Sequence, residues 1–247
     1  MCHKRSAPLP HPGASFPFGR PRTIEHAVDS VSPMTDEPAD AGREDPGDLA
    51  FNLPGAALRA KADEIRQAHP FRVFTLRLFG EHSQERAWRR GAEGEREVGR
   101  HLGKLGHGWK VIHGVPIGAH DADVDHVVIG PPGVFTLNTK NHLGGRVTVS
   151  SKAIYVNGAF QPYLAKSRAE GKRATKLLSV ASGYEVIVQP LIVIMASDLR
   201  IKNPAEGVSV IGRKRIVRWL LSQPHTLTTE EVDAIYSVAR RRSTWVS

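Results

Sequence analysis

Between residues 121 and 142, hydrophobic and polar positions alternate with a period of two around the turn at residues 130–133, Gly-Pro-Pro-Gly. This period is typical of β-strands, whose successive side chains point to opposite faces. In the first strand the alternation separates Asp123, Asp125, Val127 and Ile129 from Val124, His126 and Val128. In the second strand it places on one face Val134, Thr136, Asn138 and Lys140. Because Gly and Pro supply the dihedral angles of tight turns, the segment predicts an antiparallel hairpin.

The length of the turn predicts the register of this hairpin. A four-residue loop pairs Ile129 with Val134. Counting back in steps of two then sets Asp125 opposite Asn138 and Asp123 opposite Lys140. Directly opposed side chains have Cβ atoms about 4.5–5.5 Å apart. The register therefore predicts that these polar groups share one small site.

A period of three to four residues predicts a long helix over approximately residues 83–105. Its buried stripe consists of Ala87, Gly91, Gly94, Val98, Leu102 and Leu105. Glu95 falls on this stripe, whereas Glu93 and Glu97 point elsewhere. A buried carboxylate is costly unless it is paired or bound to a metal. An arginine partner and a metal both meet this requirement, and the pattern alone leaves both open.

The remaining pattern predicts further strands and helices. Strands are expected at residues 109–115, at 145–160 as edge strands around an Asn157-Gly158 turn, at 185–195 and at 207–211. The apolar strand at 185–195 is typical of a strand buried on both faces. Helices are expected at residues 163–182, from Arg213, and from Thr228, where Thr228 and Glu231 form a capping box.

The order of these elements predicts an α/β protein with an α-β-β-β-α-β core. A mixed central sheet would be flanked by helices, with helical additions at both ends of the chain. We expect a disordered segment at residues 1–52, a helical lead-in at 53–86, the core domain at 87–196, and a C-terminal strand and helices packed on it at 197–247.

Composition narrows the class of protein. The 247 residues contain one cysteine, Cys2, which excludes an internal disulfide and a Cys-based zinc cluster and favours a reducing compartment. No apolar run reaches the roughly 18 residues of a membrane span, and no secretory signal is recognisable. We therefore expect a cytoplasmic protein with no membrane partner.

Charge and proline are unevenly distributed. Eight of the 17 prolines lie in residues 1–50, where five basic and eight acidic residues give a net charge of −3, which favours disorder. Met34 offers an alternative start. The total of +9 leaves +12 for residues 51–247. A basic body suggests a phosphate-rich partner, with a solvated basic surface as the alternative.

Two stretches together carry a family resemblance: GAEGE at residues 91–95 and DVDHVVIGPPGVFTLNTKNH at 123–142. In this order they resemble the nuclease-related domain (NERD), placed within the PD-(D/E)XK nuclease superfamily. The resemblance runs from about Trp88 to Met195. It implies a restriction-endonuclease-like fold with the same order of elements, and a phosphodiesterase site assisted by Mg²⁺ or Mn²⁺.

The resemblance also implies roles for single residues. Glu95 matches the glutamate of the family's helix, Asp125 its metal-binding aspartate, and Lys140 the lysine that orients the attacking water. Oxygen ligands suit Mg²⁺, and an ammonium group complements a developing oxyanion. Asn138 departs from the pattern, because family members commonly carry an acid two residues before the lysine. An amide oxygen can ligate Mg²⁺ but brings no charge, so we expect Asn138 to be a weak ligand.

The helix at residues 163–182 offers a replacement for the missing acid. Lys166, Glu170 and Arg173 lie at i, i+4 and i+7 on one face. Glu170 would then act as the second acid, with Lys166, Arg173 and the neighbouring Lys172 on nucleic-acid phosphates. The alternative is a surface ladder of ion pairs.

Other motifs point to other chemistries. His120 and His126, with the aspartates between them, suggest a zinc site, although His126 is predicted to face away from Asp125. Arg and Trp occur together at residues 213–219 and 239–245, as in proteins that stack single-stranded bases, or as plain solvated helix ends. No glycine loop that cradles phosphates is present, so no nucleotide cofactor is expected.

Two hypotheses of different classes follow. The first is a Mg²⁺-dependent nuclease that hydrolyses phosphodiester bonds in DNA, with Glu95, Asp125 and Asn138 on the metal and Lys140 on the water. The second is a catalytically inactive module of the same fold that binds nucleic acid or a protein partner. Asn138 favours the second, whereas the set of Glu95, Asp125 and Lys140 favours the first. Oligomeric state is left open.

Overall fold

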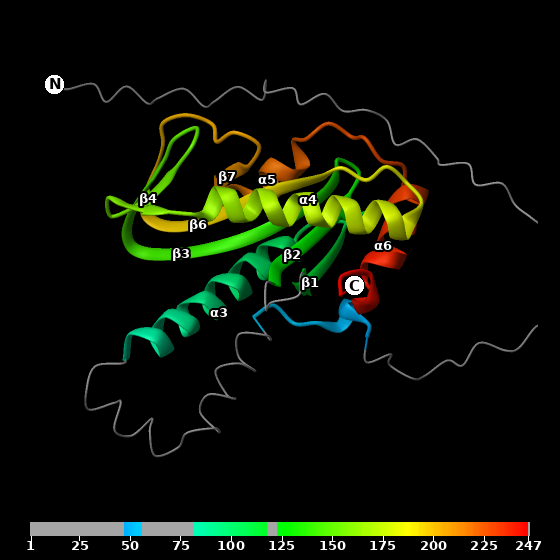
Figure 1. The fold of residues 1–247 in the computed structure, drawn as a ribbon, viewed down its shortest axis with the longest axis horizontal. Coiled ribbons are helices and arrows are strands. Elements are labelled where there is room, and N and C mark those ends of the chain that lie inside the picture. Colours follow the sequence, from blue (N-terminus) through cyan, green and yellow to red (C-terminus); the bar gives the residue numbers. More distant parts are fainter. Residues whose placement is uncertain (1–46, 56–81, 118–122, 247) are drawn as a thin grey trace, which may run out of the picture.

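A seven-stranded mixed sheet forms the centre of the protein (Figure 1). The computed structural model describes residues 47–55, 82–117 and 123–246, with backbone alone for 82–88. The strands are β1 (Lys110–Pro116), β2 (Asp123–Gly130), β3 (Gly133–Val149), β4 (Ile154–Val156), β5 (Ala159–Gln161), β6 (Val188–Ile201) and β7 (Ser209–Gly212). β1, β2 and β3 pair antiparallel in sequence, β3, β4 and β5 likewise, and β3, β6 and β7 pair parallel. The predicted mixed sheet of an α/β fold is confirmed, and it is consistent with a restriction-endonuclease-like fold.

Helices cover both faces of the sheet. They are α3 (His82–Leu102), α4 (Tyr163–Ser182), α5 (Ile216–Leu221) and α6 (Thr229–Ala239), with 3-10 turns η1 (Leu49–Phe51), η2 (Arg213–Arg215) and η3 (Arg242–Thr244). Apolar side chains of α4 and α6 pack against one face, and those of α3 and α5 against the other. Figure 1 shows α4 across the front of the sheet and α5 behind it. In the part of the chain described, no helix is long and apolar enough to cross a membrane.

Several local predictions are confirmed. α4 has the predicted bounds, 163–182, and it ends at Gly183, whose φ of +72° gives the left-handed C-cap that glycine favours. Thr228 and Glu231 form the capping box of α6. Asn157 and Gly158 connect β4 and β5 with φ of +49° and +87°. α3 ends three residues earlier than predicted, at Leu102.

The β2–β3 hairpin has the predicted register, with Ile129 opposite Val134, but the ladder stops at His126 opposite Leu137. The predicted pairing of Asp125 with Asn138 and of Asp123 with Lys140 is therefore wrong as a backbone pairing. Asp123 instead lies opposite Pro116 on β1.

Strict alternation also fails at the start of β2. Val124 packs in the same cluster as Val127 and Ile129, although alternation places it on the opposite face. The β1–β2 pairing is interrupted at Gly114, whose φ of +58° lies in the left-handed region.

β3 is longer than the sequence suggests. Residues 146–149, predicted as an edge strand of their own, continue β3 after an irregularity between His142 and Arg146. β6 runs along one edge of β3 over its whole length, while β2 and β4 pair with opposite ends of the other edge. Among the described residues, no strand pairs with this second edge between Leu137 and Val147. This gap positions the candidate site.

The predicted end of the disordered segment, at residue 52, lies too far along the chain. Residues 1–46 and most of the predicted lead-in at 53–86 lie outside the described residues, but residues 47–55 pack on the domain. We call residues 47–55 the N-terminal strap. Leu49 is buried in the cluster beneath α4 and α6, and Asp48 forms an ion pair with Arg240. Asn52 donates to the backbone oxygen of His113 at 2.9 Å. The boundary at residue 52 is therefore wrong for residues 47–52.

Candidate nuclease site

The candidate site lies where β2 and β3 separate. Beyond the last backbone pair of the two strands, a side chain of β2 bonds to the backbone of β3: the Asp125 Oδ2 accepts a hydrogen bond of 2.5 Å from the Thr139 amide. Burial raises the pKa of Asp125, and the nearby Lys140 charge and the Thr139 amide oppose this rise. The strand ends thus hold a carboxylate in a place where its ionised form is costly.

α3 brings a second carboxylate to this point because a glycine allows close approach. A Cβ at Gly94 would lie 3.2 Å from the Thr139 Cγ2 and 3.2 Å from the Asn141 Cβ. Asn141 also donates to the Arg90 backbone oxygen at 2.8 Å and so ties β3 to the helix. The next residue, Glu95, is 9% exposed and, as predicted from the stripe, faces inward.

The environment of Glu95 strongly favours its neutral form. Burial raises its pKa from 4.5 to about 8, and the charge of Asp125 adds to this rise. Lys140 and a hydrogen bond from the Gly55 backbone, in the strap, lower it. Among the described residues, no arginine pairs with Glu95, whereas Glu97 of the same helix forms an ion pair with Arg213.

α4 supplies a third carboxylate on the other side of β3. Asn138 is buried, and its Nδ2 donates to the Glu170 Oε2 at 2.7 Å. Burial raises the pKa of Glu170, while the Asn138 hydrogen bond and the Lys140 charge lower it. Glu170, which the sequence suggests as a substitute acid, is thus in contact with Asn138, which stands where family members commonly carry an acid.

Lys140 is electrostatically coupled to all three carboxylates. Its positive charge lowers the pKa of Glu95, of Asp125 and of Glu170. Its Nζ lies 5.4 Å from the centroid of the Tyr163 ring, in a cation–π contact. The Tyr163 hydroxyl is in turn 3.1 Å from the His142 Nε2. Tyr163 and His142 are site neighbours that the sequence analysis did not single out, although both lie on elements that supply other site residues.

The donor set is suitable for a hard divalent cation. Mg²⁺ is typically held by one or two carboxylates together with water and substrate phosphate. Glu95 and Asp125 repel each other, and bound positive charge would offset this repulsion. Within the described residues, no three or more His, Cys, Asp or Glu side chains converge closely enough to hold a metal by themselves. The fit is therefore to a cation with two protein carboxylates, for which the remaining ligands come from elsewhere.

The three predicted phosphate contacts are exposed on α4. Lys166, Lys172 and Arg173 all point into solvent, whereas Glu170 is only partly exposed. Among the described residues, no ion pair joins Glu170 to Lys166 or Arg173. Glu170 thus faces the site, and the predicted ladder of ion pairs along this helix does not form.

The other sequence motifs lie elsewhere. His126 is fully buried and shares a hydrogen bond of 2.8 Å between its Nδ1 and the His113 Nδ1. Burial lowers the pKa of His126 to about 3. His120, the other half of the suggested zinc site, lies outside the described residues. Trp245 is also fully buried, with its Nε1 donating to the Ala239 backbone oxygen, so it has no exposed face for stacking.

Comparison with known families found a match to part of the chain. Residues 90–195 match the nuclease-related domain family. The matched segment makes up less than half of the 247-residue chain. Within the matched residues lie all the predicted site residues, from Glu95 on α3 to Arg173 on α4. No curated protein and no solved structure matched the chain.

Proposed function

We propose that this protein is a metal-dependent nuclease that hydrolyses phosphodiester bonds in DNA. The observation that supports this most is the convergence of Glu95, Asp125 and Glu170 on one lysine, each with a raised pKa. Structural acids are normally paired, and groups whose pKa values are shifted by burial and by one another are typical of functional sites. The nuclease-related domain gives this cluster a reaction class.

The proposed roles follow from the position of each side chain. Glu95 and Asp125 hold Mg²⁺ or Mn²⁺, and the Asn138 oxygen is a weak third ligand. When bound, the cation supplies Lewis-acid polarisation of the phosphate. Lys140 orients water and stabilises the negative charge that develops on the phosphate oxygens. Glu170, tied to Asn138 at 2.7 Å, provides the second acid of the lysine motif.

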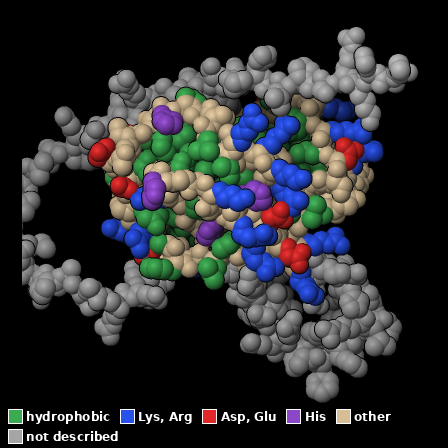
Figure 2. All heavy atoms as spheres, turned by 180° about the vertical axis from the view of Figure 1, so that it is seen from behind, with side chains coloured by type: hydrophobic (Ala, Val, Ile, Leu, Met, Phe, Trp, Pro, Cys, Tyr) green, Lys and Arg blue, Asp and Glu red, His purple; other side chains and the backbone are tan. Residues whose placement is uncertain are grey.

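Nucleic acid would meet a basic surface around this site. Lys166, Lys172 and Arg173 are exposed on α4. On the opposite face, Figure 2 shows Lys and Arg side chains gathered over the part of the molecule where Figure 1 places α3 and α5. Exposed basic residues of those helices are Arg89, Arg90, Arg100 and Arg218, and Lys104 follows just after α3. Contacts to phosphates release counterions, so binding is expected to weaken steeply with salt.

The α4 contacts can be tested by salt titration. Replacing Lys166 and Arg173 together with alanine is expected to reduce the magnitude of the log affinity–log salt slope by about two, because each phosphate contact contributes roughly one unit. Lys176→Ala, an exposed lysine farther along α4, tests whether any charge loss has the same effect. An unchanged slope in the double variant would place the nucleic acid away from this part of α4.

The decisive experiment is cleavage of supercoiled plasmid with Mg²⁺, with Mn²⁺ and with EDTA. Cleavage is expected with either metal and not with EDTA. Glu95→Gln is expected to reduce the rate at least 100-fold, because it removes a metal ligand. Glu93→Gln is the matched control, since Glu93 is exposed on the same helix two residues away. Equal loss in both variants, or cleavage that persists in EDTA, would contradict the proposal.

One observation favours a second function. Asn138 brings no charge, and its amide group donates to Glu170, so the lysine motif holds one acid fewer than the family pattern. The alternative is a catalytically inactive module that binds nucleic acid or a protein partner. Normal binding of DNA without cleavage under either metal would decide for this alternative.

A further inference from the structure

Beyond the candidate site, β3 continues into a region where one face of the sheet is open to solvent. Val147, Val149 and Ile154 are fully buried in the cluster beneath the first turns of α4. The residues that alternate with them, Thr148 and Tyr155, face the other way. Among the described residues, this end of the sheet packs on one side only, so its second side is open within the part of the chain that the structure describes.

Four residues form a row across this open side. Arg200 on β6 lies opposite Thr148 on β3, Thr148 lies opposite Tyr155 on β4, and Tyr155 lies opposite Phe160 on β5. The neighbouring row places Arg146 opposite Asp198. We call these six residues the aromatic–arginine face: Arg146, Thr148, Tyr155, Phe160, Asp198 and Arg200.

The two aromatic rings of this face are accessible. Phe160 is 61% exposed and Tyr155 is 39% exposed. Their ring centroids are 6.2 Å apart and their planes are inclined at 70°. A cross-strand aromatic pair stabilises a short hairpin, but that role alone does not require rings this exposed. The exposed ring surface is available for stacking.

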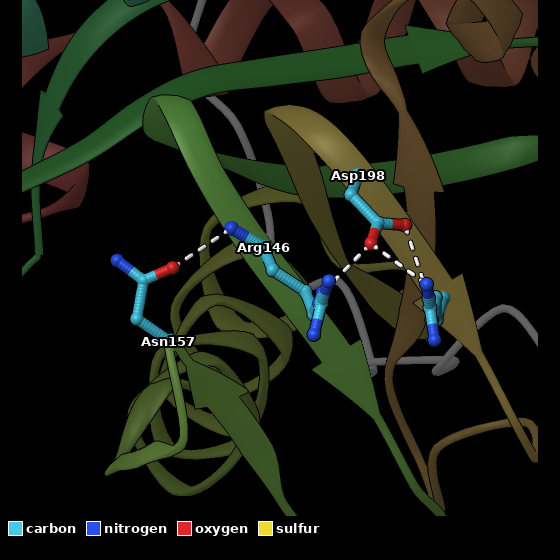
Figure 3. A network of polar contacts seen from close by, with 4 residues as sticks. Arg146, Asn157 and Asp198 are labelled. Atoms are coloured by element: carbon cyan, nitrogen blue, oxygen red, sulfur yellow. Dashed lines mark hydrogen bonds and ion pairs between the residues drawn. The ribbon is translucent and has the colours of Figure 1, made fainter.

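The two arginines are held in place by one carboxylate. The Arg146 Nε donates to the Asp198 Oδ2 at 2.8 Å, and the Arg200 Nε donates to the Asp198 Oδ1 at 3.1 Å. Figure 3 shows Arg146 and Asp198 facing each other across the strands, with Asn157 on the other side of Arg146. One acid between two guanidinium groups leaves a net positive charge. Most N–H donors of both groups remain free for phosphate oxygens.

An open hollow of about 690 Å³ lies beside this face. Backbone and side chain hydrogen bonds shape its floor, including one of 2.9 Å from the Gly144 amide to the Ser197 Oγ. Its lining residues are Gly144, Gly145, Arg146, Thr148, Asn157, Gly158, Ser197 and Asp198.

We propose that single-stranded nucleic acid binds across the aromatic–arginine face. Unpaired bases stack on Phe160 and Tyr155, and the adjoining phosphates contact Arg146 and Arg200. Single strands expose the flat faces of their bases, which a duplex hides, and proteins bind them with aromatic rings combined with positive charge. This inference rests on the proposed nuclease function and specifies its substrate: a nucleic acid with a single-stranded part.

Binding of a fluorescent oligothymidylate of about 15 nucleotides, followed by anisotropy in EDTA, tests the proposal without any cleavage. Phe160→Ala and Tyr155→Ala are each expected to weaken binding about tenfold, since one base loses its stacking partner. Phe51→Ala is the matched control, because Phe51 is 62% exposed but lies on η1, away from β4 in Figure 1. The control is expected to bind normally.

A second readout addresses the charge. Arg200→Ala is expected to reduce the salt slope of oligothymidylate binding by about 0.7, the value for one phosphate contact to a single strand. Arg241→Ala removes an exposed arginine at the far end of the molecule and is expected to leave the slope unchanged. Circular dichroism and melting curves of every variant verify that the fold is retained.

The outcomes separate this proposal from the proposed function. If Phe160→Ala and Tyr155→Ala bind oligothymidylate as the unchanged protein does, and the protein still cleaves DNA, then the proposed binding face is wrong and the proposed nuclease function stands. Loss of binding in those variants, in a protein that never cleaves, supports the face and rejects the nuclease. If the two variants instead abolish self-association in sedimentation while oligothymidylate binding persists, the face joins copies of this chain and the proposal is wrong.

Discussion

The acids around Lys140 and two acids that are paired with arginine elsewhere, Asp198 and Asp48, have opposite pKa shifts. Burial raises the pKa of Asp125, whereas hydrogen bonds from Arg200 and Arg146 lower that of Asp198. The same contrast separates Glu95 from Asp48, whose pKa is lowered by its hydrogen bond to Arg240. The difference lies first in burial, which is the main cause of the raised pKa values at the site, and then in the partner, because Asp198 and Asp48 accept hydrogen bonds directly from arginine. A bound cation would therefore stabilise the ionised form of the site acids, whereas the paired acids are already stabilised by arginine.

The largest expected effect is on catalysis. Asp125→Asn is expected to reduce the DNA cleavage rate at least 100-fold, because the proposed metal loses a charged ligand. Asp48→Asn changes the same type of residue, which is paired with Arg240 in the strap, and is expected to leave cleavage of the plasmid within about twofold. Single-turnover rates measure both. Equal losses would show that the two kinds of acid do not differ in function.

The next effect is on stability as a function of pH, without metal. The pKa of Glu95 is raised from 4.5 to about 8, so its contribution to folding is complete below pH 4.5 and is lost as pH rises toward 8. Asp125 and Glu170 shift in the same direction. In EDTA, the free energy of unfolding is expected to fall by roughly 2–4 kcal/mol between about pH 5 and pH 8.

Urea unfolding across this pH range measures the effect. Glu95→Gln is expected to flatten the dependence, because the amide cannot ionise. Added Mg²⁺ is expected to restore stability at high pH, where the acids are ionised and bind it best. A stability that does not change with pH in EDTA would mean that these carboxylates are ionised at no cost, contrary to their burial.

The strap gives an effect of similar kind but opposite direction. Because the pKa of Asp48 is lowered, its contribution is present above its unfolded pKa and is lost as pH falls through its folded pKa. Asp48 also caps η1 by accepting from the Ala50 amide at 2.9 Å. Asp48→Asn is expected to lower the free energy of unfolding by about 1 kcal/mol at neutral pH, because the ion pair is lost while Asn can still cap η1. In strong acid, where Asp48 is protonated, the loss is expected to be smaller.

Removal of residues 1–52 extends this test. The truncated chain loses Leu49, which is 3% exposed, and is expected to lose about 2 kcal/mol or more in stability. Removal of residues 1–46 is the control, since it keeps the strap. Thermal melts of both chains compare them directly. Equal melting temperatures would contradict the packing of the strap.

The smallest expected effect comes from restoring an acid two residues before Lys140, as the family pattern has it. Asn138→Glu adds an acid beside Glu170, so it is expected to tighten Mg²⁺ binding about tenfold and to lower stability without metal by roughly 1 kcal/mol. Glu170→Gln is expected to reduce cleavage, and Asn138→Glu to restore it in part. Calorimetric titration and cleavage of the four combinations measure this. If Mg²⁺ affinity and cleavage are the same in all four, Asn138 and Glu170 do not act together.

Much of the fold was predictable because its signals are local. The turn at residues 130–133 specifies the pairing of Ile129 with Val134, and apolar periodicity specifies the bounds of α4. Periodicity also placed Glu95 on the inward face of α3. Position within a hairpin or a helix repeat is readable from neighbouring residues alone.

What failed depends on contacts between distant segments. Asp125 does not pair across the ladder with Asn138, because its carboxylate binds the Thr139 amide where the strands separate. Leu49 is buried because segments far along the chain surround it: β1 contacts η1, and the Leu49 amide donates to the Arg240 backbone oxygen. The sequence drew attention to Trp near arginine, yet Trp245 is in the core. The exposed aromatic rings are Tyr155 and Phe160, whose short strands carry no distinctive motif.

The continuity of β3 has a consequence for the lengths of the products. One strand, bound along its whole length to β6, carries Lys140 near its middle and Thr148 near its end. Eight residues of extended chain span roughly 25 Å at about 3.3 Å each, less what the irregularity after His142 takes up. Under both proposals, β3 fixes the distance between the aromatic–arginine face, where a single strand binds, and the site around Lys140, where a phosphodiester bond is cleaved. Cleavage would then fall at a set number of nucleotides from the gripped bases, whatever their sequence.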